Sequence, residues 1–533
     1  MAIATNLPAP PEFAARSLAA DPHEFRAKMG SISRQSSIYF AGTLLTAAAG
    51  YFFKIYMARK LGAEALGLYA LGMTVVGFLG LFNSLGLPSA AARFVAEYSA
   101  TKKYDLLGGF LRSSLALLSG CNVLLGAAVL IVGPWIATHF YHAPSLTPCL
   151  WAFALIMLLG VLTTFLGQVM AGFQDVTTRT LITHFIGSPA TIVGAVFLIN
   201  FGFGLQGYLA AQVASAFLVL ILLAFSVWKM TPARARFAGS VVRVEKEVVA
   251  FSTVAFGIAA LEFVLSQADK VVLGYYLDAR QVGIYAVAMA LVGFVPIALQ
   301  SVNQIFSPII AELHAIGNKA LLQQLFSTLT KWILVLTFPL ALTIVVFAWP
   351  LMDIFGKGFE SGAVVLAVGA VGQLFNCAVG SVGFLLLMSG LQMQSIKIQA
   401  VSATVMIVLT LILVPRIGLI GAGIATAVSV VVTNLWSLAS VRSRLGLFPY
   451  HSGYIKLVAP AIVSSAIVFI LARMSGGMVS RWPVAIVAMA CAYVSFVGMV
   501  LMWSLDSYDR LFARMVWGKA GRLLEQLEIK TRG

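Results

Sequence analysis

The stretch KIYMARKLGAEALGLYALGMTVVGF, residues 54–78, returns in altered form at residues 270–294 as KVVLGYYLDARQVGIYAVAMALVGF. The two windows share residues at an offset of 216, among them Lys54 with Lys270, Leu61 with Leu277, Gly67 with Gly283, Tyr69 with Tyr285, Met73 with Met289, and Gly77-Phe78 with Gly293-Phe294. In both windows a short polar break separates two apolar runs, so each is typical of two helices joined by a turn.

The repeat continues beyond these windows. MAGFQ (170–174) matches MSGLQ (388–392) at an offset of 218, and GLQGYLAAQVAS (204–215) matches GLIGAGIATAVS (418–429) at an offset of 214. Apolar helices resemble one another in general, but chance similarity does not explain three windows at nearly one offset. The sequence therefore predicts two homologous halves.

The composition indicates a lipid environment. Of 533 residues, 60% are hydrophobic and 10% are charged, against about 25% charged in a soluble domain, and the mean hydropathy is +0.96. The net charge of +16 would suggest a nucleic-acid partner in a soluble protein. Here the basic residues lie in short loops between apolar runs, which favours retention on one side of a membrane and no nucleic-acid binding.

Long apolar runs predict the number of membrane spans. A helix needs about 20 apolar residues to cross the hydrocarbon core. Such runs predict an all-α polytopic membrane protein with about fourteen transmembrane helices, at residues 36–58, 65–87, 107–132, 147–171, 181–200, 205–228, 248–270, 282–305, 326–350, 362–389, 396–415, 418–440, 454–473 and 482–504. Two of the expected connections, near 201–204 and near 416–418, are very short.

The basic residues predict the orientation of these spans. With a cytoplasmic N-terminus, 26 of the 35 Lys and Arg residues fall on the cytoplasmic side, seven on the opposite side, and Lys54 and Lys270 within spans. The positive-inside rule then places both termini in the cytoplasm. The first thirty residues lack an apolar core, so we expect no cleavable signal peptide and expect the first span to direct insertion.

The repeat and the spans together predict the organisation of the chain. Six spans separate each window from its copy, so the halves insert in the same sense and a substrate path is expected between them. The expected parts are a cytoplasmic N-terminal segment (1–34), an N-terminal six-helix lobe (35–230), a cytoplasmic interlobe loop (231–246), a C-terminal six-helix lobe (247–445), a terminal helix pair (453–505) and a cytoplasmic amphipathic tail (506–533).

This layout resembles the Wzx-type flippases, the polysaccharide-transport branch of the multidrug/oligosaccharidyl-lipid/polysaccharide (MOP) exporter superfamily. The resemblance covers roughly residues 30–505 and rests on LGAEALGLYAL (61–71), QADKVVLGYYLDARQVGIYA (267–286) and GLIGAGIATAVS (418–429). It implies export of an undecaprenyl-diphosphate-linked oligosaccharide across the bacterial cytoplasmic (inner) membrane, for cell-surface polysaccharide or lipopolysaccharide synthesis. The implied partners are this lipid-linked substrate and membrane lipids, with a coupling ion (H⁺ or Na⁺) and polysaccharide-assembly proteins left open.

Ionisable residues within spans are the first candidates for a substrate site, because each is costly in lipid. Lys54 continues a stripe with Thr43, Thr46 and Gly50, and the repeat places it opposite Lys270. Two ammonium groups suit a diphosphate. The alternative for Lys54 is a side chain that extends to the outer interface.

The seventh span adds two carboxylates. Glu262, with Ser266 and Lys270, forms a stripe at i, i+4 and i+8, and is a candidate for ion coupling or for substrate contact; a fixed interhelical salt bridge is the alternative. Asp269 is a second ion-coupling candidate. It neighbours Lys270, so the two side chains should point in different directions, and the resemblance favours a structural role for Asp269.

Amides and loop arginines complete the candidate site. Asn83, Gln300, Asn303 and Gln304 are candidates for sugar contacts in the central cleft, although interhelical hydrogen bonds are the commoner use of such groups. Arg93 and Arg112, expected in the first cytoplasmic loop, are candidates for drawing the diphosphate to the inward mouth. Neither cysteines nor histidines have metal-ligand spacing, so we expect no metal and no cofactor.

Three other function classes compete with a flippase. An ion-coupled multidrug antiporter of the same superfamily is the main alternative, although paired lysines and the extra helix pair fit it less well. A membrane polysaccharide polymerase or glycosyltransferase would need clustered carboxylates or a large outer loop. The chain contains no P-loop, and a purely structural role does not account for charges within repeated lobes. We therefore expect a transporter and not an enzyme.

Overall fold

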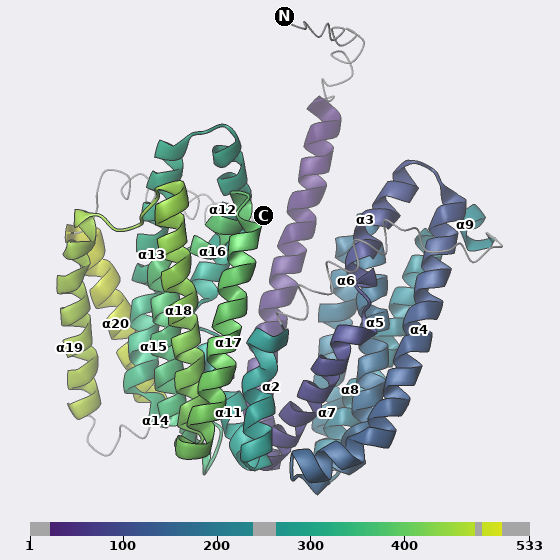
Figure 1. Ribbon diagram of the computed structural model, residues 1–533, viewed down its shortest axis with the longest axis horizontal. Coiled ribbons are helices and arrows are strands. Elements are labelled where there is room, and N and C mark those ends of the chain that lie inside the picture. The colour runs from purple at the N-terminus through teal and green to yellow at the C-terminus, as the bar shows by residue number, and fades with distance from the viewer. Residues whose placement is uncertain (1–21, 238–262, 475–481, 504–533) are drawn as a thin grey trace, which may run out of the picture.

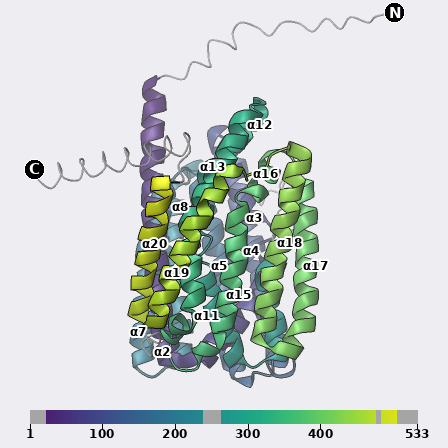
Figure 2. The ribbon, with the colours of Figure 1, turned by 90° about the vertical axis from the view of Figure 1, so that its left-hand side faces the viewer.

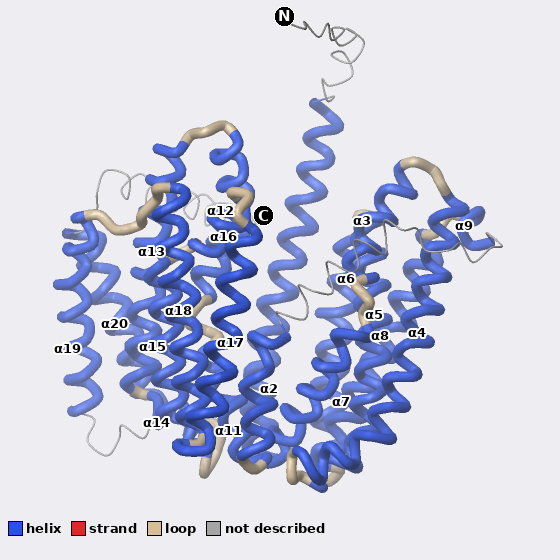
Figure 3. The backbone as a smooth tube through the Cα atoms, viewed as in Figure 1, coloured by secondary structure: helices blue, strands red, loops and turns tan. Residues whose placement is uncertain are grey.

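The computed structural model describes residues 22–237, 263–474 and 482–503, and these ranges contain only helices and loops (Figure 3). One helix, described over residues 263–276, carries no label. The labelled helices are α2 (Pro22–Asn83), α3 (Leu87–Ala100), α4 (Tyr104–Trp135), η1 (Ile136–Phe140), η2 (Pro144–Cys149), α5 (Leu150–Gly172), α6 (Val176–Thr180), η3 (Leu181–Gly187), α7 (Ser188–Asn200), α8 (Gly204–Met230), α9 (Ala233–Phe237), α11 (Ala279–Val292), α12 (Ile297–Ala315), α13 (Lys319–Val346), α14 (Ala348–Asp353), η4 (Phe359–Gly362), α15 (Ala363–Val379), α16 (Val382–Met388), α17 (Gln392–Ile417), α18 (Leu419–Leu445), η5 (Ser452–Leu457), α19 (Val458–Met474) and α20 (Trp482–Trp503).

The described residues confirm a polytopic helical membrane protein. Eleven helices are long and apolar enough to cross a membrane, and the bent pair of α11 and α12 makes a twelfth. The count differs from fourteen because α2 contains both of the first two expected spans, and because most of the expected span 248–270 lies outside the described residues. The very short connections near 201–204 and 416–418 are confirmed as the turns between α7 and α8 and between α17 and α18.

The turn within α2 requires glycine. Gly62 has φ 79° and ψ 177°, a conformation that is essentially restricted to glycine. Its repeat counterpart is Asp278, which has φ −72° and ψ 161° and accepts a hydrogen bond from the backbone N–H of Gln281 at the start of α11. The two halves therefore reverse the chain at the same place by different local means, one with a glycine at positive φ and one with an N-cap.

The helices form two lobes that touch at one end and diverge toward the other (Figure 1). One lobe contains the second part of α2 and helices α3 to α9, and the other contains helices from α11 to α18. Helices α19 and α20 pack beside α13, on the outside of the second lobe (Figure 2). We call the end with Gly62 and the start of α11 the joined end, and the end with the α3–α4 and α12–α13 turns the splayed end.

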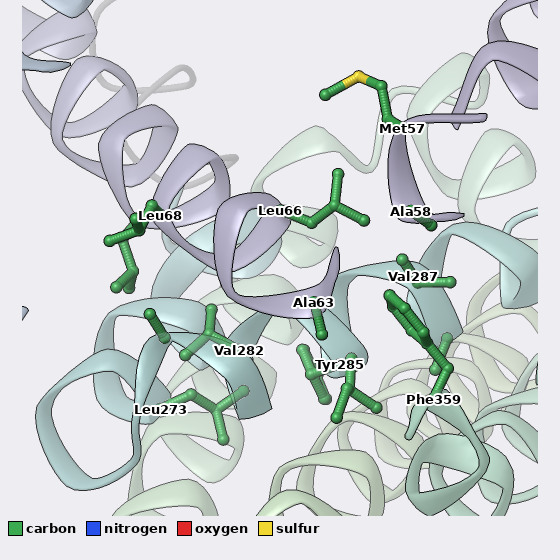
Figure 4. Close-up of a cluster of buried hydrophobic side chains, with 14 of the residues drawn as sticks. Met57, Ala58, Ala63, Leu66, Leu68, Leu273, Val282, Tyr285, Val287 and Phe359 are labelled. Carbon is green, nitrogen blue, oxygen red and sulfur yellow. The ribbon is translucent and has the colours of Figure 1, made fainter. Parts of the chain in front are cut away.

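Two glycines bring the lobes together at the joined end. A Cβ atom on Gly67 would collide with the backbone carbonyl of Ala279, and a Cβ atom on Gly283 would collide with that of Ala63. The two contacts are equivalent under the repeat, because the offset of 216 converts Gly67 to Gly283 and Ala63 to Ala279. The pseudo-twofold axis of the repeat therefore passes through this crossing of α2 and α11. Apolar side chains from both helices surround it (Figure 4).

A hydrogen bond between helices that occurs once in each lobe also confirms the repeat. The hydroxyl of Ser215 on α8 donates to the carbonyl of Gly187 at 2.7 Å, and the hydroxyl of Ser429 on α18 donates to that of Ser402 at 2.9 Å. The donors are 214 residues apart and the acceptors 215. Because the same interhelical hydrogen bond recurs at the repeat offset, the two halves share their packing as well as their sequence pattern.

The lobes also differ from the predicted spans. The expected loop before the third span is largely helical, as α3, because its alanines and glutamate favour helix. The eighth span bends by 53° between α11 and α12. The tenth is interrupted after α15 at Gly380, which has φ 76° and lies against Thr330 of α13, whereas its counterpart α5 is continuous.

Candidate functional site

Lys54 lies half-buried on the first part of α2, eight residues before the turn at Gly62. Phe52, about 200° away around the helix, is 70% exposed. A Cβ atom on Gly50, one turn before Lys54 and on the same side, would have no neighbour within 4 Å. An apolar and a basic side chain thus occupy opposite sides of α2, as expected if one side meets lipid and the other meets the space between the lobes.

Lys270 approaches Lys54 from the other half of the repeat. The charge of Lys270 acts on the ammonium group of Lys54 across the boundary between the lobes. The Nζ atom of Lys270 donates to Oε1 of Gln267 at 2.8 Å and to the carbonyl of Ser266 at 3.3 Å. An ammonium group has three N–H donors, so these two acceptors do not saturate it, and neither acceptor is a carboxylate.

The structure thus places the two lysines that the repeat pairs within range of each other's charge. Within the ranges that the structure describes, no carboxylate forms an ion pair with either ammonium group. Two like charges in a partly desolvated place repel each other, and an anion between them would relieve that repulsion. Glu262, the third member of the predicted stripe, lies outside the described residues.

Asp269 points away from the ammonium group of Lys270, as adjacent positions on a helix must. Its carboxylate is 6% exposed and accepts a hydrogen bond of 2.6 Å from the hydroxyl of Tyr285 on α11. That hydroxyl is also 3.2 Å from the hydroxyl of Thr426 on α18. Asp269 therefore joins three helices of one lobe.

The other lobe lacks this carboxylate. Tyr69, the counterpart of Tyr285, accepts a hydrogen bond of 3.3 Å from Gln212 on α8. Phe53 stands where the second lobe has Asp269, and its ring lies 5.7 Å from that of Tyr208. The tyrosine is present in both halves of the chain, but only the second lobe has a buried acid beside it.

No hydrogen bond between described residues links the predicted amide side chains to Lys54 or Lys270. Gln300 and Gln304 are exposed on α12, beyond the 53° bend. Asn303 on the same helix is buried, and its side-chain oxygen has no hydrogen-bond partner within the described structure. Asn83 is buried at the end of α2, where its carbonyl accepts from the amide of Asn122 at 3.1 Å.

The two arginines lie on helices and not in a loop, which corrects the predicted position of both. Arg93 is exposed on α3, and its guanidinium lies 5.3 Å from the centre of the Phe94 ring. Arg112 is exposed on α4 at the edge of a hollow of about 510 Å³ that also contacts Trp228 of α8. Both arginines lie on the two helices of the first lobe that the α3–α4 turn connects at the splayed end.

Sequence reasoning missed two contacts of α2 and one buried cation. Thr46 shares a hydrogen bond of 3.1 Å with Nδ1 of His184, on the π-helical segment η3. Nε of Arg59 donates to the carbonyl of Ile354 at 2.7 Å and so ties α2 to the second lobe. Lys331, counted among the orientation signals, is 2% exposed on α13. Of these three features, only the contact of Thr46 had a signal in the sequence, because Thr46 belongs to the predicted stripe that includes Lys54.

Metal-ligand clusters are absent from the described part of the chain, and its four cysteines are unpaired thiols. Helix N-caps explain several of the other polar side chains: the side chains of Asp175 and Asn318 accept from backbone N–H groups at the starts of α6 and α13. The polar side chains of the described residues can therefore bind a ligand through charge and through hydrogen bonds.

Comparisons with known proteins agree on the fold. The probable flippase AglR of Haloferax volcanii is 20% identical over 428 residues, which span 78% of this chain and 84% of that protein. A structure of the lipid II flippase MurJ in an inward closed conformation matches with a TM-score of 0.68 at 15% identity, covering 86% of this chain and 98% of that one. An inward-facing multidrug resistance MATE family transporter of the MOP superfamily matches with a TM-score of 0.61 at 14% identity, covering 74% and 94%.

A comparison of the sequence with family models shows which family the chain belongs to. The family model described as polysaccharide biosynthesis protein matches residues 56–361, more than half of the chain, from the first lysine's helix to the middle of the second lobe. With the repeated lobes and the helices long enough to cross a membrane, this identifies the protein as a multi-pass membrane member of the polysaccharide biosynthesis protein family.

Proposed function

We propose that the protein is a flippase that moves an undecaprenyl-diphosphate-linked oligosaccharide across the bacterial cytoplasmic membrane by alternating access. The diphosphate binds between Lys54 and Lys270, and the glycan occupies the space between the lobes on the splayed side. The family, named for polysaccharide biosynthesis, and the relative described as a probable flippase support this substrate class. No covalent bond changes, so no catalytic residue or cofactor is required.

The lysine pair is the observation that carries the proposal. Lys54 and Lys270 occupy equivalent places in the two halves of the repeat, each in the first span of its half. A diphosphate carries charge on both phosphoryl groups, so one ammonium can serve each of them. Lysine acts on phosphate as a point charge and needs no fixed geometry, which suits a site whose two walls move relative to each other.

The joined end supplies the gate of the proposed cycle. In this state the Gly67–Gly283 crossing and the Arg59 hydrogen bond hold the lobes together. With both termini cytoplasmic, the splayed end faces the cytoplasm and the structure is inward-facing. The basic residues of the α3–α4 connection, Lys102 and Lys103, and those of the last turn of α18, Arg442 and Arg444, lie at the splayed end, as the positive-inside rule requires of a cytoplasmic face.

The remaining candidates take secondary parts in this proposal. Arg93 and Arg112 draw the anionic headgroup toward the splayed end, and Asn83, Gln300, Asn303 and Gln304 contact sugars along its path. Glu262 and Asp269 are the ion-coupling candidates, with H⁺ or Na⁺ as the ion. Polysaccharide-assembly proteins are the expected partners in the membrane.

An ion-coupled multidrug antiporter is the second candidate. The fold shared with a MATE transporter and the buried carboxylate of Asp269 favour it. The two functions make opposite demands on the lysines. A cationic drug gains from their removal because like charges repel, whereas an anionic lipid headgroup loses both of its partners.

The test is outward translocation of undecaprenyl-diphosphate-linked oligosaccharide in reconstituted vesicles. We expect wild type to translocate, Lys54→Gln and Lys270→Gln each to slow it by at least about tenfold, and the double variant to abolish it, because a charged hydrogen bond contributes about 1.5–3 kcal/mol. Lys397→Gln, an exposed lysine on α17, is the matched control. Full activity of the double variant at normal protein level would refute the lysine site; drug efflux that survives in it would favour the antiporter.

A further inference from the structure

An apolar hollow lies on the boundary between the two lobes, against the helix that carries Lys270. Its volume is about 440 Å³, within the roughly 300–1,000 Å³ of ligand pockets. Its walls are the second part of α2, the end of α4 with η1, and the helix over residues 263–276, which contributes Val271. The hollow thus includes surface from both halves of the repeat.

Two contacts between α2 and the 263–276 helix bound the hollow along its length. Toward the splayed end, the rings of Phe78 and Phe263 pack with centres 6.0 Å apart. Toward the joined end, a Cβ atom on Gly274 would collide with Leu71 and with the ring of Tyr141. The hollow lies between these two contacts, where Val271 of one helix and Thr74, Val75 and Leu79 of the other line it.

The lining is almost entirely apolar, and both of its hydroxyl groups have hydrogen-bond partners within the protein. The hydroxyls of Thr74 and Tyr141 are buried and share a hydrogen bond of 2.9 Å, and the indole of Trp135 lies at the exposed edge. Thr74 also donates to the carbonyl of Leu71 at 2.7 Å. Burial raises the pKa of Tyr141, an effect that the hydrogen bond to Thr74 partly offsets, so the phenol remains uncharged. Only an apolar occupant suits these walls.

The hollow opens toward the lipid-facing side of α4. Trp135 is 59% exposed and Val132 is 48% exposed, and both line the hollow. On its other side lies Lys270, the residue that precedes Val271. Successive residues on a helix are about 100° apart, so the same helix presents its cation to one space and its valine to the other.

We propose that this hollow holds the isoprenoid tail of the lipid-linked substrate while its diphosphate lies at Lys54 and Lys270. The proposal rests on the flippase function above and specifies where the tail leaves the site. The occupant is the substrate's own chain and not a bulk phospholipid, because one helix carries both Lys270, which binds the headgroup, and Val271, which lines the hollow. The tail then occupies a lobe boundary, so movement of the lobes changes the fit of tail and headgroup together.

Binding of two probes to the protein in nanodiscs tests the tail site. Undecaprenyl diphosphate carries the long chain, and geranyl diphosphate carries the same headgroup on a short one. Ala128→Phe fills the hollow, and Ala127→Phe makes the same change at the adjacent exposed position. We expect Ala128→Phe to weaken binding of the long-chain probe by about tenfold, equivalent to 1.4 kcal/mol, with the short-chain probe unaffected and Ala127→Phe like wild type.

Photocross-linking provides a second measurement that does not depend on filling the hollow. A benzophenone amino acid at Val132 should cross-link to undecaprenyl diphosphate, and the same group at Ile131, which is 78% exposed on the adjacent face, should cross-link to phospholipid. Phospholipid alone at Val132, uncompeted by the long-chain probe, overturns the tail site.

The outcomes separate the two proposals. Equal affinity of wild type for the two probes, or equal loss in the two alanine variants, overturns the tail site and leaves the lysine site standing. Loss of both probes in Lys54→Gln and Lys270→Gln, with chain-length dependence only at Ala128, supports both. Binding of neither probe by wild type overturns both.

Discussion

The hydroxyl of Tyr285 donates a hydrogen bond of 2.6 Å to the buried carboxylate of Asp269, although the equivalent tyrosine of the first lobe, Tyr69, has no acid beside it. A buried carboxylate that loses a donor is costly. Tyr285→Phe should therefore destabilise the protein by about 1–3 kcal/mol, measured by thermal unfolding in detergent. Tyr69→Phe, whose side chain is only half-buried, should cost less. Equal losses would mean that the carboxylate is satisfied without Tyr285.

The Gly67–Gly283 crossing predicts which substitutions open the joined end. Gly67→Ala and Gly283→Ala each place a Cβ atom against a backbone carbonyl that cannot move aside, so both should shift the protein away from this state. Spin labels at Lys60 and Lys357, exposed residues of the joined end, should report longer distances in both variants.

The matched control for this crossing is Gly80→Ala on α2, where a Cβ atom has no neighbour within 4 Å. It should leave the label distance unchanged. Unchanged distances in the Gly67 and Gly283 variants as well would show that the crossing does not hold the lobes together.

Arg59 should contribute a smaller part of the same closure. Arg59→Gln removes the hydrogen bond to the carbonyl of Ile354, and because the side chain is exposed we expect a shift of about 1 kcal/mol toward the opened joined end. The same label distance measures it. Arg416→Gln removes another exposed arginine from the joined end and should have no effect; a matching effect would assign the change to surface charge.

Gly62 should resist substitution for conformational and not for steric reasons. A Cβ atom there has no neighbour within 4 Å, but the residue has φ 79°. Gly62→Ala should cost about 1–3 kcal/mol in strain, seen as a lower midpoint of thermal unfolding. Gly50→Ala, on the same helix and equally unobstructed, should be neutral or slightly stabilising because alanine favours helix. Tolerance of Gly62→Ala would show that the turn adjusts.

Hydropathy and repetition predict most of this fold because they depend on local composition. The apolar runs locate the spans, and the offset of 216 alone is enough to pair Lys54 with Lys270. The shape of individual spans depends on contacts that hydropathy does not record. The interruption at Gly380, for example, is tied to Thr330 on another helix.

The candidate site is only partly predictable for the same reason. The bond between Thr46 and His184 crosses 138 residues, and no local pattern indicates it. The polar residues of α12 are alike in sequence, yet the fold buries Asn303 and exposes Gln300 and Gln304. A lysine near the end of a span usually sets the orientation of that span in the membrane. That rule does not predict that Lys331 is buried on α13.

At the glycine crossing of the joined end, the two halves contact each other through equivalent residues. Each glycine meets the carbonyl of the other half's alanine, which lies four residues before that half's own glycine. Two separate copies of one six-helix chain, inserted in the same sense, would form this contact about a true twofold axis. A homodimeric ancestor therefore needs no new interface to become this protein, only a covalent link between its subunits. Within one chain the two halves can differ, as they do where one has Asp269 and the other has Phe53.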